Sequence, residues 1–365
     1  MNVLKSVLLG IFTILIGVAI WVSTSSKDGI SMVSNGTTIM KGVITSEKEN
    51  FFKDQRVKDI FLKNNIDIQV NRMTSDKIIK ATTTSDFDSY SDFIFPSSIT
   101  VSEKVRTNFK GSQTYNVFYS PMIVATWTPI IDILKANNLI KTNGNYNNLN
   151  MEGFQKTVEA GIRWKDLKQS EQYPVNKVVL ISSSDTRFSG SAKMFAALNS
   201  YVLNNHNVVS NSTEIDKIMP ELKQIIQAQG HRENSSANMT SDYISIGRGK
   251  VPMMFTYESE FLNIAFQNKG LFKKDMKIVY PSPTIFSKHV MVIINPKAQI
   301  VADLLKNNED LKKIAVEYGF RIDGDNQIVQ KAKSFGIDIP EDVIDVIDPP
   351  NYDILDSITE LAEQK

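Results

Sequence analysis

The stretch Val178–Leu203, with the sequence VVLISSSDTRFSGSAKMFAALNSYVL, points to the fold class of this chain. Its first four residues are apolar and predict a short buried strand, Val178–Ile181. Its last thirteen residues, Ser191–Leu203, are predicted to form a helix. A strand that leads through a polar loop into a helix is the repeating unit of α/β domains. This stretch therefore predicts an α/β fold.

The same alternation of strand and helix continues outward in both directions. The predicted strands are Thr38–Ile44, Ile66–Asn71, Phe93–Phe95, Tyr115–Ala125, Val251–Thr256, Lys277–Tyr280 and Val290–Ile294. The predicted helices are Phe51–Asn64, Ser75–Ala81, Gly153–Leu167, Glu214–Gln229, Ala298–Asn307 and Glu309–Tyr318. This order is typical of a parallel sheet covered by helices.

The loop between Val178–Ile181 and the following helix carries the strongest sign of a ligand site. It holds six hydroxyl side chains, one arginine and one glycine directly before a helix start. Such a start presents free N–H groups and a partial positive charge, which suit an anion or a carbonyl oxygen. A guanidinium can add a bidentate hydrogen bond, and a glycine lets the backbone approach a ligand closely. The candidate ligand residues in this loop are Ser184, Asp185, Thr186, Arg187, Ser189, Gly190 and Ser191. The ordinary alternative is that these serines and this aspartate only cap the helix.

Two further loops occupy equivalent places between a strand and a helix. Ser46 follows the first predicted strand, and Ser97 and Ser98 follow Phe93–Phe95 and Pro96. Each alone is most simply a helix cap. Because ligands of parallel sheets bind at the carboxyl ends of strands, the three loops together predict one converging cleft.

Composition excludes several classes of protein. The chain has 365 residues, enough for about two domains, and a formal net charge of +1, so no global field attracts nucleic acid. It has no cysteine, which rules out disulfides, cysteine-ligated zinc, thiolate catalysis and a lipid-modified cysteine. Its three histidines are scattered, so a histidine metal site is not expected. We expect no cofactor and no bound metal.

The N-terminal segment predicts a membrane location. Val7–Val22 is uncharged, with Lys5 before it and Lys27 after it. We expect residues 3–23 to form an uncleaved transmembrane anchor, residues 24–36 to be a linker, and the rest of the chain to lie outside the cytoplasm. A cleaved signal peptide is the competing interpretation, and a buried core helix is a third.

The order of the elements and the chemistry of these loops resemble a known family, the two-lobed periplasmic-type solute-binding proteins of type II. The residues that carry the resemblance are Ser46-Glu47-Lys48, Phe95-Pro96-Ser97-Ser98, the run Tyr115–Val124, and the loop Ser184–Ser191. The last of these loosely resembles the helix-start loop of phosphate-binding and other oxyanion-binding members. The likeness covers about residues 38–325.

The resemblance implies two Rossmann-like lobes joined by a hinge, with the ligand between them. The first lobe would be residues 37–122 and 290–335, and the second residues 123–289. Ser46, Ser98, Ser184, Arg187, Ser189 and Ser191 would face the solute, together with Tyr257 and Glu258 from the loop that follows Val251–Thr256. Since Glu47 and Glu258 would repel an anion, a small organic or mixed-charge ligand is the alternative to phosphate.

The predicted function is therefore capture of a small polar or anionic solute, without catalysis, for an ABC-type membrane transporter or another envelope protein. One alternative is an envelope interaction module that keeps the scaffold but binds no small ligand. Another is a hydrolase that uses a serine of the 182–191 loop.

The acidic extension 336–365 is a separate feature of the sequence. From Gly336 onward it holds nine acidic residues and one lysine. Ile354, Leu355, Ile358, Leu361 and Ala362 form a helical apolar stripe. This stripe predicts a helix docked on the body of the protein, or one that binds a partner.

Overall fold

The computed structural model describes residues 36–84, 91–267, 270–324 and 326–364. The predicted anchor at 3–23 and most of the linker lie outside these residues. Within them, no helix is both long and apolar enough to cross a membrane.

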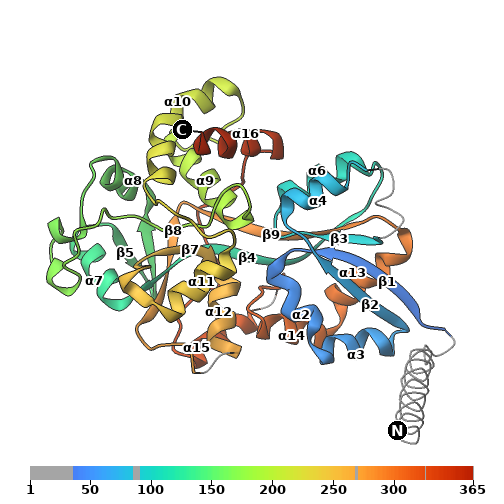
Figure 1. The fold of residues 1–365 in the computed structure, drawn as a ribbon. Helices are drawn as coiled ribbons and strands as arrows, with labels where there is room; N and C mark the ends of the chain where they lie inside the picture. The colour runs from blue at the N-terminus through green and yellow to red at the C-terminus, as the bar shows by residue number, and fades with distance from the viewer. Residues whose placement is uncertain (1–35, 85–90, 268–269, 325, 365) are drawn as a thin grey trace, which may run out of the picture.

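The sheet runs through two lobes, which are arranged side by side in Figure 1. Its strand order is β2-β1-β3-β9-β4-β8-β6-β5, with β7 paired to β4 and β10 to β9. The strands are β1 Thr38–Ile44, β2 Ile66–Arg72, β3 Phe93–Phe95, β4 Thr114–Trp127, β5 Ile140–Asn143, β6 Tyr146–Asn150, β7 Met254–Tyr257, β8 Met276–Ser282, β9 Thr284–Ile293 and β10 Val346–Ile347. We call the part around β1, β2 and β3 the first lobe, and the part around β5 to β8 the second lobe.

The long strand β4 belongs to both lobes. Its residues Thr114 to Pro121 pair antiparallel with β9, and its residues Met122 to Trp127 pair with β7 and β8. Because β4 runs antiparallel to β7, β8 and β9, and β9 runs antiparallel to β3, the sheet is mixed, and the prediction of a parallel sheet was wrong at its centre. The predicted lobe boundaries, at 122–123 and 289–290, stay predictions.

Helices cover both faces of the sheet in each lobe. In Figure 1, α4 and α6 lie above the strands of the first lobe, and α2, α3 and α14 lie below them. The helices of the first lobe are α2 Glu49–Lys53, α3 Gln55–Lys63, α4 Ser75–Ala81, α6 Ile99–Asn108, α13 Gln299–Asn307 and α14 Glu309–Glu317. Those of the second lobe and the C-terminal region are α7 Thr128–Ala136, α8 Met151–Glu159, α9 Gly190–Leu203, α10 Ser212–Gln227, α11 Ser236–Ser245, α12 Glu258–Gln267, α15 Gln327–Ser334 and α16 Tyr352–Glu363. Short 3₁₀ turns are η1 Ser46–Lys48, η2 Trp164–Asp166, η3 Ser170–Gln172, η4 Gly247–Gly249 and η5 Pro296–Ala298.

Three local predictions need correction. Val178–Ile181 is an extended segment rather than a strand, because it joins β7 only through hydrogen bonds at Ser182. The predicted helix Phe51–Asn64 is divided at Asp54, whose extended backbone ends α2 and whose carboxylate caps α3. Helix α8 stops at Glu159, since Gly161 adopts φ +63°, a left-handed conformation that commonly ends a helix.

The acidic C-terminal region docks on the body of the protein. Helix α16 packs against α9 and α10 of the second lobe and against α6 of the first lobe. Leu355, Ile358 and Ala362, from the predicted apolar stripe, are buried in that contact. The helix thus contacts both lobes, and Figure 1 shows it above the second lobe with one end toward α6.

Candidate functional site

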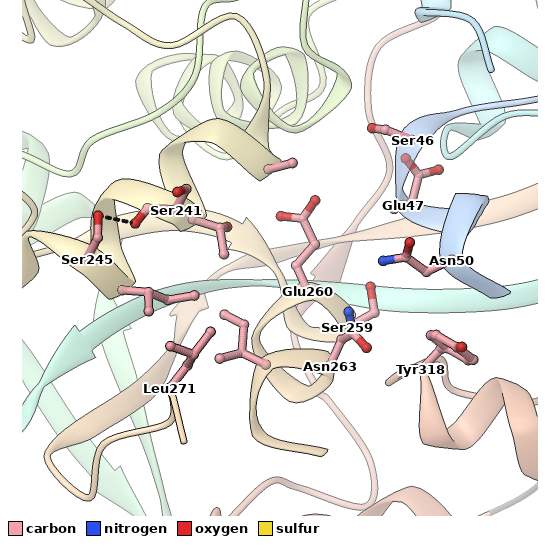
Figure 2. A pocket seen from close by; sticks show the side chains of 14 residues that line it. Ser46, Glu47, Asn50, Ser241, Ser245, Ser259, Glu260, Asn263, Leu271 and Tyr318 are labelled. Carbon is pink, nitrogen blue, oxygen red and sulfur yellow. Dashed lines mark hydrogen bonds between the residues drawn. The ribbon is translucent and has the colours of Figure 1, made fainter. Parts of the chain in front are cut away.

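The cleft between the lobes contains two neighbouring hollows. The inner hollow, of about 50 Å³, is lined by serines and threonines from η1, the start of α4, the segment after β3, the start of α11 and the loop before α9, and by Tyr257 and Arg72. The outer hollow, of about 410 Å³, lies between η1 and α2 on one side and α11 and α12 on the other (Figure 2). Ser46 and Glu47 line both. We call the two hollows together the interlobe cleft.

Predicted site residues from both lobes meet in the inner hollow. Ser46 and Ser97 come from the first lobe, and Ser189, Gly190 and Tyr257 come from the second. A Cβ atom added to Gly190 would lie 3.2 Å from the Tyr257 hydroxyl and 3.5 Å from the Ser97 hydroxyl. An added side chain would thus crowd the Tyr257 hydroxyl of the same lobe and would be in van der Waals contact with Ser97 of the first lobe.

Helix starts surround the inner hollow, and their N-terminal N–H groups are not capped by side chains. Thr45, Thr74, Ser98 and Ser189 precede η1, α4, α6 and α9, and none of the four side chains makes a capping hydrogen bond. For α9, a helix of 14 residues, the free N–H groups and the helix dipole favour a negatively charged or carbonyl oxygen. The hydroxyls of Thr45, Ser98 and Ser189 instead make hydrogen bonds to neighbouring side chains, so the backbone N–H groups are the ligand contacts that these helix starts offer.

Three other predicted serines lie next to the inner hollow instead of lining it. Ser98 shares a hydrogen bond of 2.8 Å with Thr100 and borders a small gap beside Gly190. Ser184 donates to Ser189 at 2.7 Å and lies 3.1 Å from the Ser191 hydroxyl. Ser184 and Ser191 are fully buried, so they hold the loop in shape from behind.

The charged part of the predicted loop points away from the cleft. Arg187 forms an ion pair of 2.6 Å with Asp185, and its side chain is 58% exposed. Burial alone would raise the pKa of Asp185, but the hydrogen bonds from Arg187 hold it below its usual value. Thr186 donates to Glu363 of α16. In this structure Asp185, Thr186 and Arg187 connect the loop to itself and to α16, and none of them lines the cleft.

The side chain of Glu258 does not line the cleft either. It starts α12 instead of lying in a loop, and its carboxylate receives hydrogen bonds from Arg321 Nε at 2.7 Å and Nη2 at 2.9 Å. The Tyr280 hydroxyl donates to the same carboxylate. All three side chains are buried, and burial raises the pKa of Tyr280 well above its usual value. This group stabilises the core near the sheet.

Sequence reasoning missed Glu260, which lines the outer hollow. Its carboxylate accepts hydrogen bonds from Ser236 and Thr256, each at 2.6 Å. Burial raises the pKa of Glu260 to about 7. No sequence signal marked it, because Thr256 belongs to β7 and Glu260 to α12, so their pairing depends on where α12 begins.

A second missed group lies behind Glu47. The buried ammonium of Lys48 contacts Glu47, Thr45 and the Nδ1 atom of His289 at 3.1 Å. Burial lowers the pKa of Lys48, and it lowers that of His289 well below the usual value, so His289 is neutral at physiological pH. The group links η1 to β9 and fixes the position of Glu47.

The part of the chain that the structure describes contains no group of three or more histidine, aspartate or glutamate side chains able to hold a metal ion. The cleft is instead lined mainly by hydroxyl side chains, together with the carboxylates of Glu47 and Glu260 and the guanidinium of Arg72. This donor set can bind the polar groups of an organic molecule or a small ion.

Comparison with known proteins places the fold. No family model matches the sequence, and no curated protein matches it. Among solved structures, the substrate binding protein of an ABC transporter from Agrobacterium tumefaciens is similar at a TM-score of 0.56 and 12% identity, over 91% of this chain and 96% of that one. The sulfate-binding protein SubI from Mycobacterium tuberculosis is similar at 0.53 and 12%, over 86% and 94%. The ferric binding protein from Campylobacter jejuni is similar at 0.53 and 12%, over 88% and 96%.

These similarities confirm the predicted resemblance at the level of the fold. The chain has the α/β fold of type II periplasmic solute-binding proteins, with a mixed sheet. At such low identity the likeness concerns the fold alone.

Proposed function

We propose that this protein is an extracytoplasmic solute-binding protein that captures a small polar solute in the interlobe cleft. The observation that carries the proposal is the meeting of Ser46 and Ser97 of the first lobe with Ser189, Gly190 and Tyr257 of the second around one hollow. Loops that leave strands and start helices thus contribute polar groups from both sides. A solute held by such groups stabilises the closed arrangement of the lobes.

The chemistry of the cleft supports binding rather than catalysis. Backbone N–H groups at the start of α9 and the surrounding hydroxyls are hydrogen-bond donors suited to a carbonyl, carboxylate or oxyanion group. The predicted guanidinium of Arg187 lies outside the cleft, and Arg72, which forms an ion pair with Glu49, lines the inner hollow instead. Solved proteins with this fold are described as sulfate-binding, ferric-binding and ABC-transporter substrate-binding, which supports a role in solute transport.

Residues 3–23 complete the proposal as a membrane anchor that keeps the protein near a membrane transporter of the ABC type. Closure would occur by a hinge motion in β4 and β9, which both connect the lobes. Mass spectrometry of the purified N-terminus tests the anchor: an intact Met1 supports it, and a new N-terminus near Ser23–Ser25 contradicts it.

Thermal unfolding of the full chain in mild detergent tests the proposed solute site, with tryptophan fluorescence as the readout. A panel of oxyanions, amino acids, amines and sugars is added to the wild type and to Gly190→Val. We expect at least one solute to raise the Tm of the wild type by several degrees and to leave Gly190→Val unchanged, because the added side chain fills the hollow.

The matched control for this experiment is Gly249→Val, since no atom lies within 4 Å of a Cβ added at Gly249. It should respond to the solute as the wild type does. If no solute in the panel shifts the wild type, or if Gly190→Val responds equally, the proposal is wrong and an interaction module on the same scaffold becomes the better account.

A further inference from the structure

The outer hollow has an uneven distribution of charge. Its volume of about 410 Å³ suits a small organic molecule. Figure 2 shows Glu47 and Glu260 projecting toward the same space from opposite walls. Among the described residues that line this hollow, none is an arginine, a lysine or a histidine. The cavity therefore presents negative charge to whatever enters it.

The two carboxylates differ in what neutralises them. Glu47 contacts the ammonium of Lys48. In the described part of the chain, by contrast, Glu260 has no ion-pair partner, and its hydrogen bonds come from two neutral hydroxyls. A carboxylate can accept about four hydrogen bonds, so lone pairs of Glu260 remain free for a ligand. A buried carboxylate without a cation is costly, and a positively charged group in the cavity would remove that cost.

A second observation in the same cavity also indicates a ligand. The side chain of Ser259 is buried, with 2% of the residue exposed, and within the described structure its hydroxyl has no hydrogen-bond partner. The carbonyl oxygen of the Asn263 side chain is likewise buried without a partner in the same described set. Both residues line the outer hollow. Because buried polar atoms are normally paired, these two atoms are expected to bind a hydrogen-bond donor.

Part of the lining is aliphatic. Ile244, Ile264 and Leu271 line the same hollow as the polar groups. They would cover the hydrocarbon part of a ligand, while carboxylate, hydroxyl and amide oxygens receive its N–H groups. An ammonium group on a short aliphatic chain combines both features.

We propose that the outer hollow binds the protonated amine of a small organic solute, with Glu260 as its charge partner and with Ser259 and Asn263 as further acceptors. The inference rests on the proposed function, because it names the chemical class of the solute in the same cleft. A carboxylate on the same molecule would extend toward the α9 start in the inner hollow, which shares the lining residues Ser46 and Glu47 with the outer one. A bare metal ion fits less well, since the described residues lack a cluster of three acidic or histidine ligands.

The experiment uses a four-carbon series at neutral pH: putrescine, γ-aminobutyrate, butanediol and succinate, with ferric and divalent metal ions as a separate arm. Affinity is measured by thermal shift and calorimetry on the full chain, on Glu260→Gln and on Glu171→Gln. Glu171 lies on the exposed surface of the same lobe and serves as the matched control. The glutamine at 260 keeps the shape of the side chain and removes a buried charge, so the variant should fold.

We expect an amine of the series to bind the wild type and Glu171→Gln equally, and to bind Glu260→Gln at least tenfold more weakly. Binding of an amine that is unchanged in Glu260→Gln overturns the inference. So does binding of butanediol, succinate or a metal ion in preference to the amines. In each of these cases, the proposed solute-binding function still holds if the compound that binds the wild type no longer binds Gly190→Val. If no compound binds here and the wider panel also fails, both proposals are wrong.

Discussion

The ammonium of Lys193 lies 3.1 Å from the carboxylate of Asp76, and the two residues belong to opposite lobes. Lys193 is in the first turn of α9, and Asp76 is at the start of α4. Asp356 of α16 contacts the same ammonium at 2.8 Å, and the ring of Tyr352 lies 5.5 Å from it. One cation beside the inner hollow therefore connects the first lobe, the second lobe and the C-terminal helix.

Replacing Lys193 by methionine should destabilise this closed arrangement. The substitution leaves Asp76 and Asp356 facing each other without a cation, and we expect the free energy of unfolding to fall by about 1–2 kcal/mol. The loss is no larger because both carboxylates are partly exposed to solvent, which screens their charges. Denaturant unfolding measures the change. Lys288→Met is the matched control, because the exposed pair between Lys288 and Asp348 should contribute less than about 0.5 kcal/mol. Equal losses in both variants would contradict this role for Lys193.

Glu258→Gln should reduce stability without changing solute binding. Arg321 is 3% exposed and would lose its charge partner, which costs about 3–5 kcal/mol for a buried pair. Thermal and denaturant unfolding give the loss, and calorimetry gives the affinity for the best solute of the panel. The double variant Glu258→Met with Arg321→Met should recover part of the stability. If Glu258→Gln instead binds the solute more weakly and keeps its stability, Glu258 contacts the ligand, as the sequence predicted.

The pH dependence of stability should report Glu260. Burial raises its pKa from 4.5 to about 7, so the folded state holds the proton more tightly than the unfolded state. The resulting contribution to stability is complete below pH 4.5 and is lost as the pH rises to about 7, at a cost on the order of 2 kcal/mol. Glu260→Gln removes this dependence, so the stability of the variant relative to wild type should increase between pH 5 and 7.5. A constant difference across that range would contradict an unpaired buried carboxylate.

Tyr257→Phe should weaken solute binding while the protein remains folded. The hydroxyl of Tyr257 faces the inner hollow beside Gly190, and burial raises its pKa well above the usual value, so it stays a neutral donor. Loss of one hydrogen bond to the solute should reduce the affinity by about tenfold. Tyr173→Phe is the control, since its hydroxyl donates to the backbone of Arg248 outside the cleft. Equal affinity in wild type and Tyr257→Phe would remove Tyr257 from the site.

Most strands could be predicted from the sequence because buried apolar runs mark them clearly. Thr38–Ile44 and Phe93–Phe95 have the predicted bounds, and Ser75–Ala81 is helical as expected. The segment Val178–Ile181 has the same apolar signal and is partly buried, but it lacks a ladder of strand partners. Hydrophobicity predicts burial, whereas strand pairing depends on where the neighbouring backbone lies.

The site could be predicted only in part, for a related reason. Ser46, Ser97, Ser189 and Gly190 follow from the rule that ligands bind at loops between strands and helices. Arg187 has the right chemistry, but Asp185 is two residues away and pairs with it locally. Glu260 carries no motif, and its role depends on the direction in which α12 leaves β7. Local competition and helix orientation are both invisible in composition and spacing.

Hydrogen exchange of the full chain, with and without the solute that gives the largest thermal shift, tests the central claim most directly. The account predicts protection in peptides that cover Thr45–Lys48 and Ser97–Thr100 of the first lobe and in peptides that cover Ser189–Ala192 and Ser236–Glu260 of the second. Protection confined to one lobe, or absent from all four segments while the solute binds, would contradict a solute site in the interlobe cleft.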